Sequence, residues 1–159
     1  MTVRWPYFPM FVKLAGERVL VVGGGEVALR KIRLLLRSGA RVEVVARELH
    51  ADVAALAAGG ELRHLGAVFA PGQLDGCRAA IAATGDAHLN GEVAAAATAR
   101  GVPVNVVDSP AASRFIVPSI VDRAPVLVAI STGGAAPVLA RRLRERIEAL
   151  LPAGYGRIA

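Results

Sequence analysis

Short apolar runs alternate with longer amphipathic segments along most of the chain. Residues 18–22, RVLVV, form a continuous apolar run that ends at glycines, which is typical of a strand buried on both faces. Residues 26–38 carry their apolar side chains on one helical face and their basic side chains mostly on the other. Gly39 ends this helix, and residues 41–45 form the next apolar run. The pattern predicts a strand–helix–strand unit.

The same alternation continues beyond this unit. It predicts helices over residues 48–58 and 87–100, and strands over residues 62–65, 79–84 and 102–107. Repeated strand–helix–strand units have right-handed crossovers, which place the strands in one parallel sheet with helices on both faces. We therefore predict an α/β fold with a doubly wound parallel sheet of the Rossmann type.

The pattern changes after Asp108. Residues 115–121 and 126–130 are β-type runs joined by the turn-like tetrad Asp122-Arg123-Ala124-Pro125, which predicts a β-hairpin. A loop of hydroxyls and glycines follows, and then a C-terminal helix is predicted over residues 137–151.

Composition excludes several classes of protein. Hydrophobic residues make up 54% of the chain and aromatic residues only 4%, so the core is built from Val, Leu, Ile and Ala. No apolar run approaches the roughly 20 residues of a membrane-spanning helix, and the N-terminus lacks the apolar region of a signal peptide. A single cysteine, Cys77, cannot form an intramolecular disulfide, so we expect a cytoplasmic protein.

The net charge of +6 comes almost wholly from arginine. Such a balance fits either solvated helix faces or an anionic partner. Nucleic acid is disfavoured as that partner, because no aromatic platform accompanies the basic residues and no zinc or helix-turn-helix signature is present. An anionic small molecule remains open, and no metal-ligand spacing is visible.

The segment GGGEVA, residues 23–28, matches the G-x-G-x-x-G/A pattern of dinucleotide-binding turns. Gly23 suits the tight turn, Gly25 lets the backbone approach a pyrophosphate, and Ala28 allows the helix to pack closely on the strand. The segment also lies between a buried strand and an amphipathic helix, as the motif requires. We predict dinucleotide binding; the alternative is a glycine turn that serves helix packing only.

The sequence does not decide which residue contacts the ribose of the cofactor. Glu43 has the expected spacing from the glycines but lies inside its strand, whereas Arg47 and Glu48 lie at the strand end. An acid there favours a free 2′-hydroxyl and an arginine accommodates a 2′-phosphate, so these two residues leave NAD against NADP undecided.

Few side chains are placed for acid–base chemistry. His50 and His64 are expected to be surface or packing residues, and His88 follows the fourth strand near the predicted cofactor edge. Asp108 ends a strand at the edge where open α/β sheets bind their ligands. It is either a functional carboxylate or a turn-initiating aspartate before Ser109-Pro110.

Five motifs follow one another along the chain: VVGGGEVALRK (21–31), AATGD (82–86), NVVD (105–108), FIVPSIVDR (115–123) and STGGAAPVLA (131–140). The first, the glycine motif with its flanks, is generic, and the last three in this order are specific. Together they resemble precorrin-2 dehydrogenases, including the N-terminal module of bacterial siroheme synthase. The resemblance extends over about residues 8–152.

The resemblance implies that the chain oxidises precorrin-2 to sirohydrochlorin with NAD⁺ on the route to siroheme; some members also insert iron. It implies a catalytic role for Asp108, where a carboxylate can accept the proton that leaves as hydride is transferred. It further implies that residues along three strand ends line the cofactor, namely Gly23, Gly24, Gly25, Glu26, Val27, Arg47, Glu48 and Thr84.

The implied substrate, a polycarboxylate tetrapyrrole, would be attracted by arginines such as Arg114. Ser131 and Thr132 lie in the family's hydroxyl-glycine loop, where Thr132 takes the position of a phosphorylatable serine. Members form homodimers through the segment after the nucleotide domain. We therefore divide the chain into an NAD-binding Rossmann domain, residues 1–112, and a dimerisation and substrate-side segment, residues 113–159. The second is short, because relatives continue with a helical segment that helps to cover the substrate site.

Two other functions compete with this one. A non-catalytic NAD-sensing module, similar to the regulatory domains of potassium transporters, would use the same Rossmann core, although the hairpin and the Ser131 loop speak against it. A scaffold that binds tetrapyrrole without oxidising it is the third reading.

Overall fold

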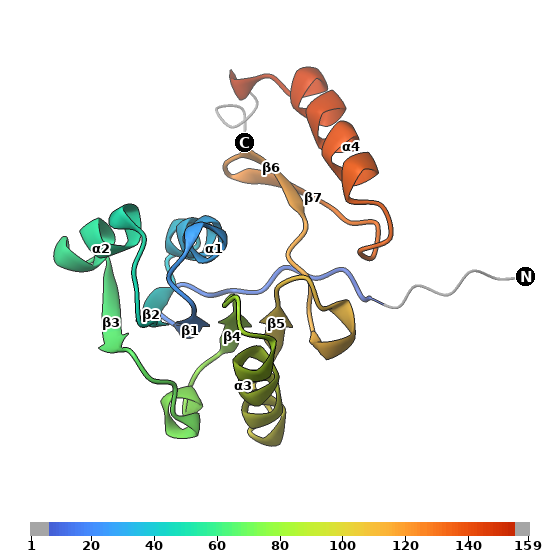
Figure 1. Ribbon diagram of the computed structural model, residues 1–159. Coiled ribbons are helices and arrows are strands. Elements are labelled where there is room, and N and C mark those ends of the chain that lie inside the picture. Colours follow the sequence, from blue (N-terminus) through green and yellow to red (C-terminus); the bar gives the residue numbers. More distant parts are fainter. Residues whose placement is uncertain (1–6, 155–159) are drawn as a thin grey trace, which may run out of the picture. The chain divides into compact units, whose positions relative to one another are not determined.

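The structure is a computed structural model that describes residues 7–154 (Figure 1). The described residues form two compact units. One comprises residues 10–115, and the other comprises residues 116–154 together with residues 7–9. The outer ends of the two segments expected from the sequence, residues 1–6 and 155–159, lie outside the described residues.

The first unit contains a five-stranded parallel sheet in the order β3-β2-β1-β4-β5. This is the order of a Rossmann sheet, in which successive strands are added on one side of β1 and then, from β4 onward, on the other. The predicted α/β fold is confirmed. The strands are β1 (Arg18–Val22), β2 (Arg41–Val45), β3 (Leu62–Gly66), β4 (Ala79–Ala82) and β5 (Val104–Val106).

Helices cover both faces of this sheet (Figure 1). α1 (Glu26–Arg37) and α2 (Ala51–Ala58) bury Ile32 and Val53 against one face. On the other face, α3 (Ala87–Ala99) and the 3-10 turn η1 (Pro71–Leu74) bury Val93 and Leu74. Because the central strands are covered on both sides, their sequences read as continuous apolar runs rather than as alternating ones.

α2 begins at Ala51, later than the sequence pattern suggests. Residues 47–50 instead form a turn after β2, in which Nδ1 of His50 accepts a hydrogen bond from the N–H of Asp52 at 3.2 Å. A side-chain acceptor before the first helical residue satisfies one of the donors that a helix start leaves unpaired. His50 is therefore a helix cap.

The second unit is the predicted hairpin and helix. β6 (Ser119–Arg123) and β7 (Val126–Ile130) pair in antiparallel fashion and pack with α4 (Pro137–Leu150). The turn is only Ala124-Pro125, joined by a cis peptide bond. Arg123 belongs to the strand, where it pairs with Val126, and its guanidinium donates to the carbonyl oxygens of Leu151 and Glu148 at the end of α4, at 2.6 and 3.1 Å.

β6 also begins later than expected, at Ser119 rather than Phe115. Phe115 belongs to the first unit, where it packs on the α1 face of the core and its carbonyl accepts a bond from the amide of Asn105 at 3.0 Å. None of the helices within residues 7–154 is long and apolar enough to cross a bilayer.

Candidate active site

The glycine turn follows β1 at the carboxyl edge of the sheet, by which we mean the edge where the parallel strands end. Gly23 has a φ of 125°, and a Cβ on it would overlap the carbonyl oxygen of Ala83, just after β4. A Cβ on Gly24 would lie 2.8 Å from the Cβ of Ala46, just after β2. Gly23 and Gly24 are thus required because the turn is packed between two neighbouring strand ends.

Gly25 is glycine for another reason. A Cβ there would meet no atom within 4 Å, so the residue faces open space. It precedes α1 without supplying a capping side chain, so the first N–H groups of the helix receive no side-chain cap. Uncapped amides at a helix start bind anions such as a pyrophosphate. Glu26, exposed, and Val27, half-buried, form the first helical turn.

Thr84 lies beside this turn, in the loop that leads from β4 to α3. The N–H of Ala83 donates to the carbonyl of Val22 at 2.7 Å, which ties the end of β4 to the end of β1. The hydroxyl of Thr84 lies 2.7 Å from Oδ1 of Asn90 on α3 and 3.0 Å from the carbonyl oxygen of Asp86 in its own loop. The structure therefore brings Thr84 and the glycines together, while the Thr84 hydroxyl is held inward.

Arg47 and Glu48 lie on the other side of the glycine turn. The N–H of Gly23 donates to the carbonyl of Val45 at 2.8 Å, so the end of β2 also adjoins the turn. Both side chains are exposed. Glu43, the alternative acid, is excluded from ribose reading because it is buried and pairs with Nη2 of Arg18 at 2.6 Å.

Asp108 lies just after β5 at the same edge, with an exposed side chain. Its φ of 59° is the left-handed conformation, which costs a residue with a Cβ about 1–2 kcal/mol and which aspartate tolerates better than most. The loop is held in place by bonds from Val107 N–H to the Ala82 carbonyl at 3.0 Å and from Val106 N–H to the Ser113 hydroxyl at 2.8 Å. Backbone held in such a conformation is concentrated at functional sites.

Lys31, to which the motifs assign no role, interacts electrostatically with Asp108. It lies half-buried on α1, and burial lowers the pKa of its ammonium group; Arg30 lowers it further, and the carboxylate of Asp108 partly offsets both. Helical side chains lean toward the helix N-terminus, so Lys31 leans toward the glycine turn. Its place in the motif of residues 21–31 was the available signal, but nothing in that spacing names Asp108 as its neighbour.

The residues assigned to the substrate side fall in both units. Arg114 is exposed in the first unit, where its N–H donates to the carbonyl of Val104 at 2.7 Å. Ser131 and Thr132 belong to the second unit. Their hydroxyl oxygens accept bonds from the N–H groups of Gly133 and Ala136 at 3.0 and 3.1 Å, so the hydroxyl hydrogens remain able to donate.

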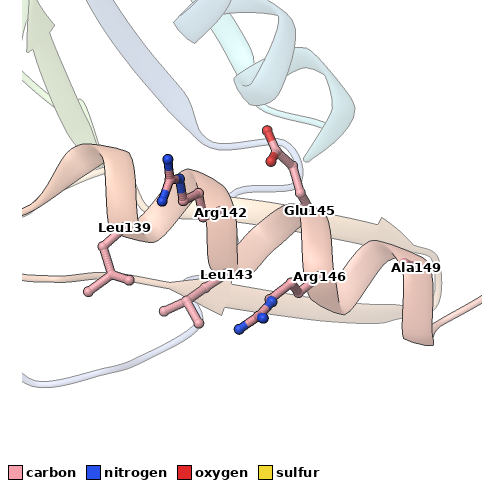
Figure 2. Close-up of a pocket in the computed structure, with 6 residues that line it drawn as sticks. All are labelled: Leu139, Arg142, Leu143, Glu145, Arg146 and Ala149. Carbon is pink, nitrogen blue, oxygen red and sulfur yellow. The ribbon is translucent and has the colours of Figure 1, made fainter.

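An open hollow runs along α4 in the second unit, and it contains none of these residues. Figure 2 shows Leu139, Leu143 and Arg146 on one side of the helix, and Arg142 and Glu145 on the other. Leu139 is 51% exposed, and the neighbouring Val138 and Leu150 are 56% and 75% exposed. Within the described residues this apolar face has no cover.

The remaining candidates have contacts with other residues of the fold. Nε2 of His64 lies 2.9 Å from the carbonyl oxygen of Ala46, and His88 pairs with Glu92 on the surface of α3. Cys77 is buried, and that burial raises the pKa of its thiol. Within residues 7–154, no three His, Cys, Asp or Glu side chains are grouped as metal ligands.

Two family models match the chain. One, described as "Putative NAD(P)-binding", covers residues 10–119. The other, described as "Sirohaem biosynthesis protein central", covers residues 128–150. The first therefore includes the whole carboxyl edge of the sheet, and the second includes the end of β7, the Ser131 loop and all of α4.

Curated relatives include siroheme synthases. The protein from Chromobacterium violaceum is 59% identical over 153 residues, which are 96% of this chain and 33% of the relative. The protein from Methylobacillus flagellatus is 59% identical over 151 residues, 95% of this chain and 32% of the relative. The chain spans about a third of the length of these relatives.

Among solved structures, the one described as "SirC, precorrin-2 dehydrogenase" matches with a TM-score of 0.80 at 29% identity. The match covers 95% of this chain and 74% of that one. The proteins that the motifs resemble are thus the proteins that match along nearly the whole chain.

Proposed function

Because this chain belongs to the NAD(P)-binding family whose model matches residues 10–119, we propose that it is an NAD-dependent precorrin-2 dehydrogenase. It oxidises precorrin-2 to sirohydrochlorin for siroheme, an assignment supported by the SirC structure and by the siroheme synthases. The observation that carries the proposal is one sheet edge on which an open glycine turn and a strained, exposed aspartate follow strands of the same sheet.

The residues at this edge fit NAD. Gly25, Glu26 and Val27 would hold the pyrophosphate at the uncapped start of α1, with Gly23 and Gly24 shaping the turn. Arg47 and Glu48 would flank the ribose. The Thr84 loop would border the cofactor between β1 and β4, where the strand order of the sheet reverses. When bound, NAD⁺ supplies the hydride acceptor.

Asp108 accepts a proton in this reaction. Removal of a hydride from the macrocycle leaves a proton to be lost, so two electrons and one hydrogen leave as hydride and the second hydrogen leaves as H⁺. The carboxylate is exposed at the strand end and can reach a ligand there. The positive charge of Lys31 interacts favourably with the negative charge of the Asp108 carboxylate.

We assign Arg114, Ser131 and Thr132 to binding of the substrate's carboxylates. A guanidinium and two hydroxyl hydrogens are donors for carboxylate oxygens. Arg114 follows Asp108 in the loop that packs on β5, which puts a cation in the same unit as the proton acceptor.

The protein acts as a homodimer in the cytoplasm under this proposal. The uncovered apolar face of α4, with Leu139 and Leu150 exposed, supports self-association of the second unit. Cys77 is a buried free thiol, which is compatible with the reducing environment of the cytoplasm. The NAD-sensing module is the less supported function, since the relatives and the matching structure are named as a synthase and a dehydrogenase.

Anaerobic incubation of the purified chain with precorrin-2 and NAD⁺, followed by absorbance, tests the proposal. NADH and sirohydrochlorin are expected together, and a parallel reaction with NADP⁺ reports the cofactor preference. Asp108→Ala is expected to lower the rate by about 10²–10⁴-fold while NAD binding persists. Adding ferrous iron to the sirohydrochlorin formed then measures iron insertion separately.

Asp75→Asn is the matched control. Asp75 is an exposed carboxylate that pairs with Arg100 at 2.9 Å, at the opposite edge of the sheet, so this variant is expected to keep the activity. NAD binding without turnover of precorrin-2 would favour the sensor. Tetrapyrrole binding that needs no NAD and makes no NADH would favour the scaffold.

A further inference from the structure

Asn90 is a buried polar residue that the proposed chemistry does not use. It lies on α3, only 8% exposed. Its amide makes three contacts, all with one residue. Oδ1 accepts from the hydroxyl of Thr84 at 2.7 Å and from the N–H of Thr84 at 3.2 Å, and Nδ2 donates to the Thr84 carbonyl at 3.0 Å. The side chain thus holds both backbone groups and the hydroxyl of a single loop residue.

The chemistry of these contacts requires an amide. Thr84 offers two donors and one acceptor, and a side chain that pairs with all three must both accept and donate. Aspartate lacks the donor, and alanine leaves polar groups of the half-buried Thr84 without their partner. Asp86, in the same loop, caps α3 by accepting from the N–H groups of His88 and Leu89.

The loop that Asn90 holds lies between the two halves of the candidate site. On one side, the Ala83 carbonyl packs directly against Gly23 of the glycine turn. On the other side, the Ala82 carbonyl accepts from the N–H of Val107, the residue before Asp108. A displacement of residues 83–84 would therefore move the surface against which both the glycine turn and the Asp108 loop are packed.

We propose that Asn90 is a positioning residue, which fixes the loop after β4 so that the glycine turn and the Asp108 loop keep the spacing that NAD binding requires. This role rests on the proposed function for the identity of the ligand. Asn90 acts through Thr84 and touches neither cofactor nor substrate. Its removal should therefore weaken NAD binding by more than it weakens the fold.

The test measures NAD⁺ affinity of the full chain by calorimetry and the melting temperature of the same samples. Asn90→Ala is expected to weaken NAD⁺ binding by about tenfold, the size of effect that loss of one or two hydrogen bonds produces. Thr84→Val removes the hydroxyl at nearly constant shape and should weaken binding in the same direction. Because both changes break one unit, the double variant should lose little more than Asn90→Ala alone.

Val93→Ala is the matched control. Val93 is fully buried on α3 and contacts the core rather than the Thr84 loop, so truncating it lowers stability without releasing the loop. Its NAD⁺ affinity is expected to equal that of the wild type even where its melting temperature falls as far as that of Asn90→Ala. With precorrin-2 as co-substrate, Asn90→Ala should raise the KM for NAD⁺ more than it lowers kcat.

Two results would overturn the role. One is equal NAD⁺ affinity in the wild type and Asn90→Ala; the other is a loss in Val93→Ala that matches the loss in Asn90→Ala at equal melting temperature. The proposed function is decided separately, by the wild type. A wild type that binds NAD⁺ without oxidising precorrin-2 would refute the dehydrogenase while leaving the role of Asn90 to be judged on affinity. Should Asn90→Ala fail to fold, Thr84→Val against Val93→Ala decides.

Discussion

The two edges of the parallel sheet use their polar groups in opposite ways. At the amino edge, where the strands begin, charged side chains pair with each other. Arg18 contacts Glu43 and the Asp75 carbonyl, Arg100 contacts the Asp75 carboxylate, and Arg78 lies 3.4 Å from Glu17. At the carboxyl edge, the side chains of Arg47, Glu48 and Asp108 make no hydrogen bond or ion pair with other residues of the described part of the chain.

This difference shows where binding capacity is kept. Charges at the amino edge pair with one another, so they offer little to a ligand. The carboxyl edge keeps uncapped amides at α1, an aspartate in a strained conformation, and open space above Gly25. Polar groups that bind a ligand cannot also be paired with other groups of the protein. The carboxyl edge therefore keeps unpaired groups and a strained backbone, which lower the stability of the fold.

Alanine at two positions of the glycine turn separates packing from binding. Gly23→Ala forces a Cβ onto the Ala83 carbonyl at a φ of 125°, and should lower the free energy of unfolding by about 3 kcal/mol or more. Gly25→Ala enters open space, and should cost no more than about 1 kcal/mol, the typical loss when an N-cap residue is replaced by alanine. Its methyl group faces the amides of α1, so NAD affinity should still fall. Denaturant unfolding and calorimetry on both variants check this, and equal destabilisation would contradict it.

The amino edge should respond in stability alone. Glu43→Gln breaks the buried pair with Arg18 and should lower the free energy of unfolding by about 2 kcal/mol, less than for a fully buried pair because Arg18 is partly exposed. Glu17→Gln removes an exposed pair with Arg78 at 3.4 Å, and should cost under about 0.5 kcal/mol. Both variants should bind NAD as the wild type does. A loss of affinity in Glu43→Gln would show that the two edges are not independent.

Cys77, near the amino edge, should make the free energy of unfolding of the protein fall at alkaline pH. Burial raises the pKa of its thiol above the ordinary value of 9.0, so the unfolded chain loses this proton first. The stabilising contribution is complete below pH 9.0 and is lost as the pH rises through the folded pKa. The difference in unfolding free energy between wild type and Cys77→Ala, measured against pH, should therefore shrink above pH 9.0. A constant difference would contradict the burial of the thiol.

Lys31, beside the carboxyl edge, should give the smallest effect and the opposite sign. Burial lowers the pKa of its ammonium below 10.5, so the folded chain releases this proton before the unfolded chain does. The destabilising contribution is complete below the folded pKa and is relieved as the pH rises toward 10.5. Relative to Lys31→Met, the wild type should therefore gain stability with rising pH. Parallel slopes for the Cys77 and Lys31 comparisons would contradict the assignment.

Local patterns predicted most of the fold because each depends on neighbours in sequence. The run at residues 18–22 and the helical face of residues 26–38 identified β1 and α1 within one residue. The start of α2 was missed because residues 47–50 are held against the glycine turn. The carbonyl of Gly24 accepts a hydrogen bond from the N–H of His50 at 2.7 Å. The start of β6 was missed because Phe115, which fits a strand by pattern, packs on the core of the first unit.

The candidate site divides along the same line. Asp108 was found from its place at a strand end, and the glycine turn from its motif. Gly24 passed as an unconstrained position of that motif, although the structure packs it as tightly as Gly23. Asn90 gave no signal, since a helical asparagine is by default a surface residue and only its partner in the loop shows why it is buried.

The parallel sheet, the hairpin, the glycine turn and the family resemblance can be predicted from the sequence alone, because periodicity and turn chemistry are local properties of the chain. Three assignments need the folded chain: Glu43 pairs with Arg18 rather than contacting a ribose, Lys31 interacts electrostatically with Asp108, and Asn90 holds Thr84. Those assignments depend on which strand ends become neighbours. That neighbourhood arises when the strands pair across long separations in sequence, and no local pattern encodes it.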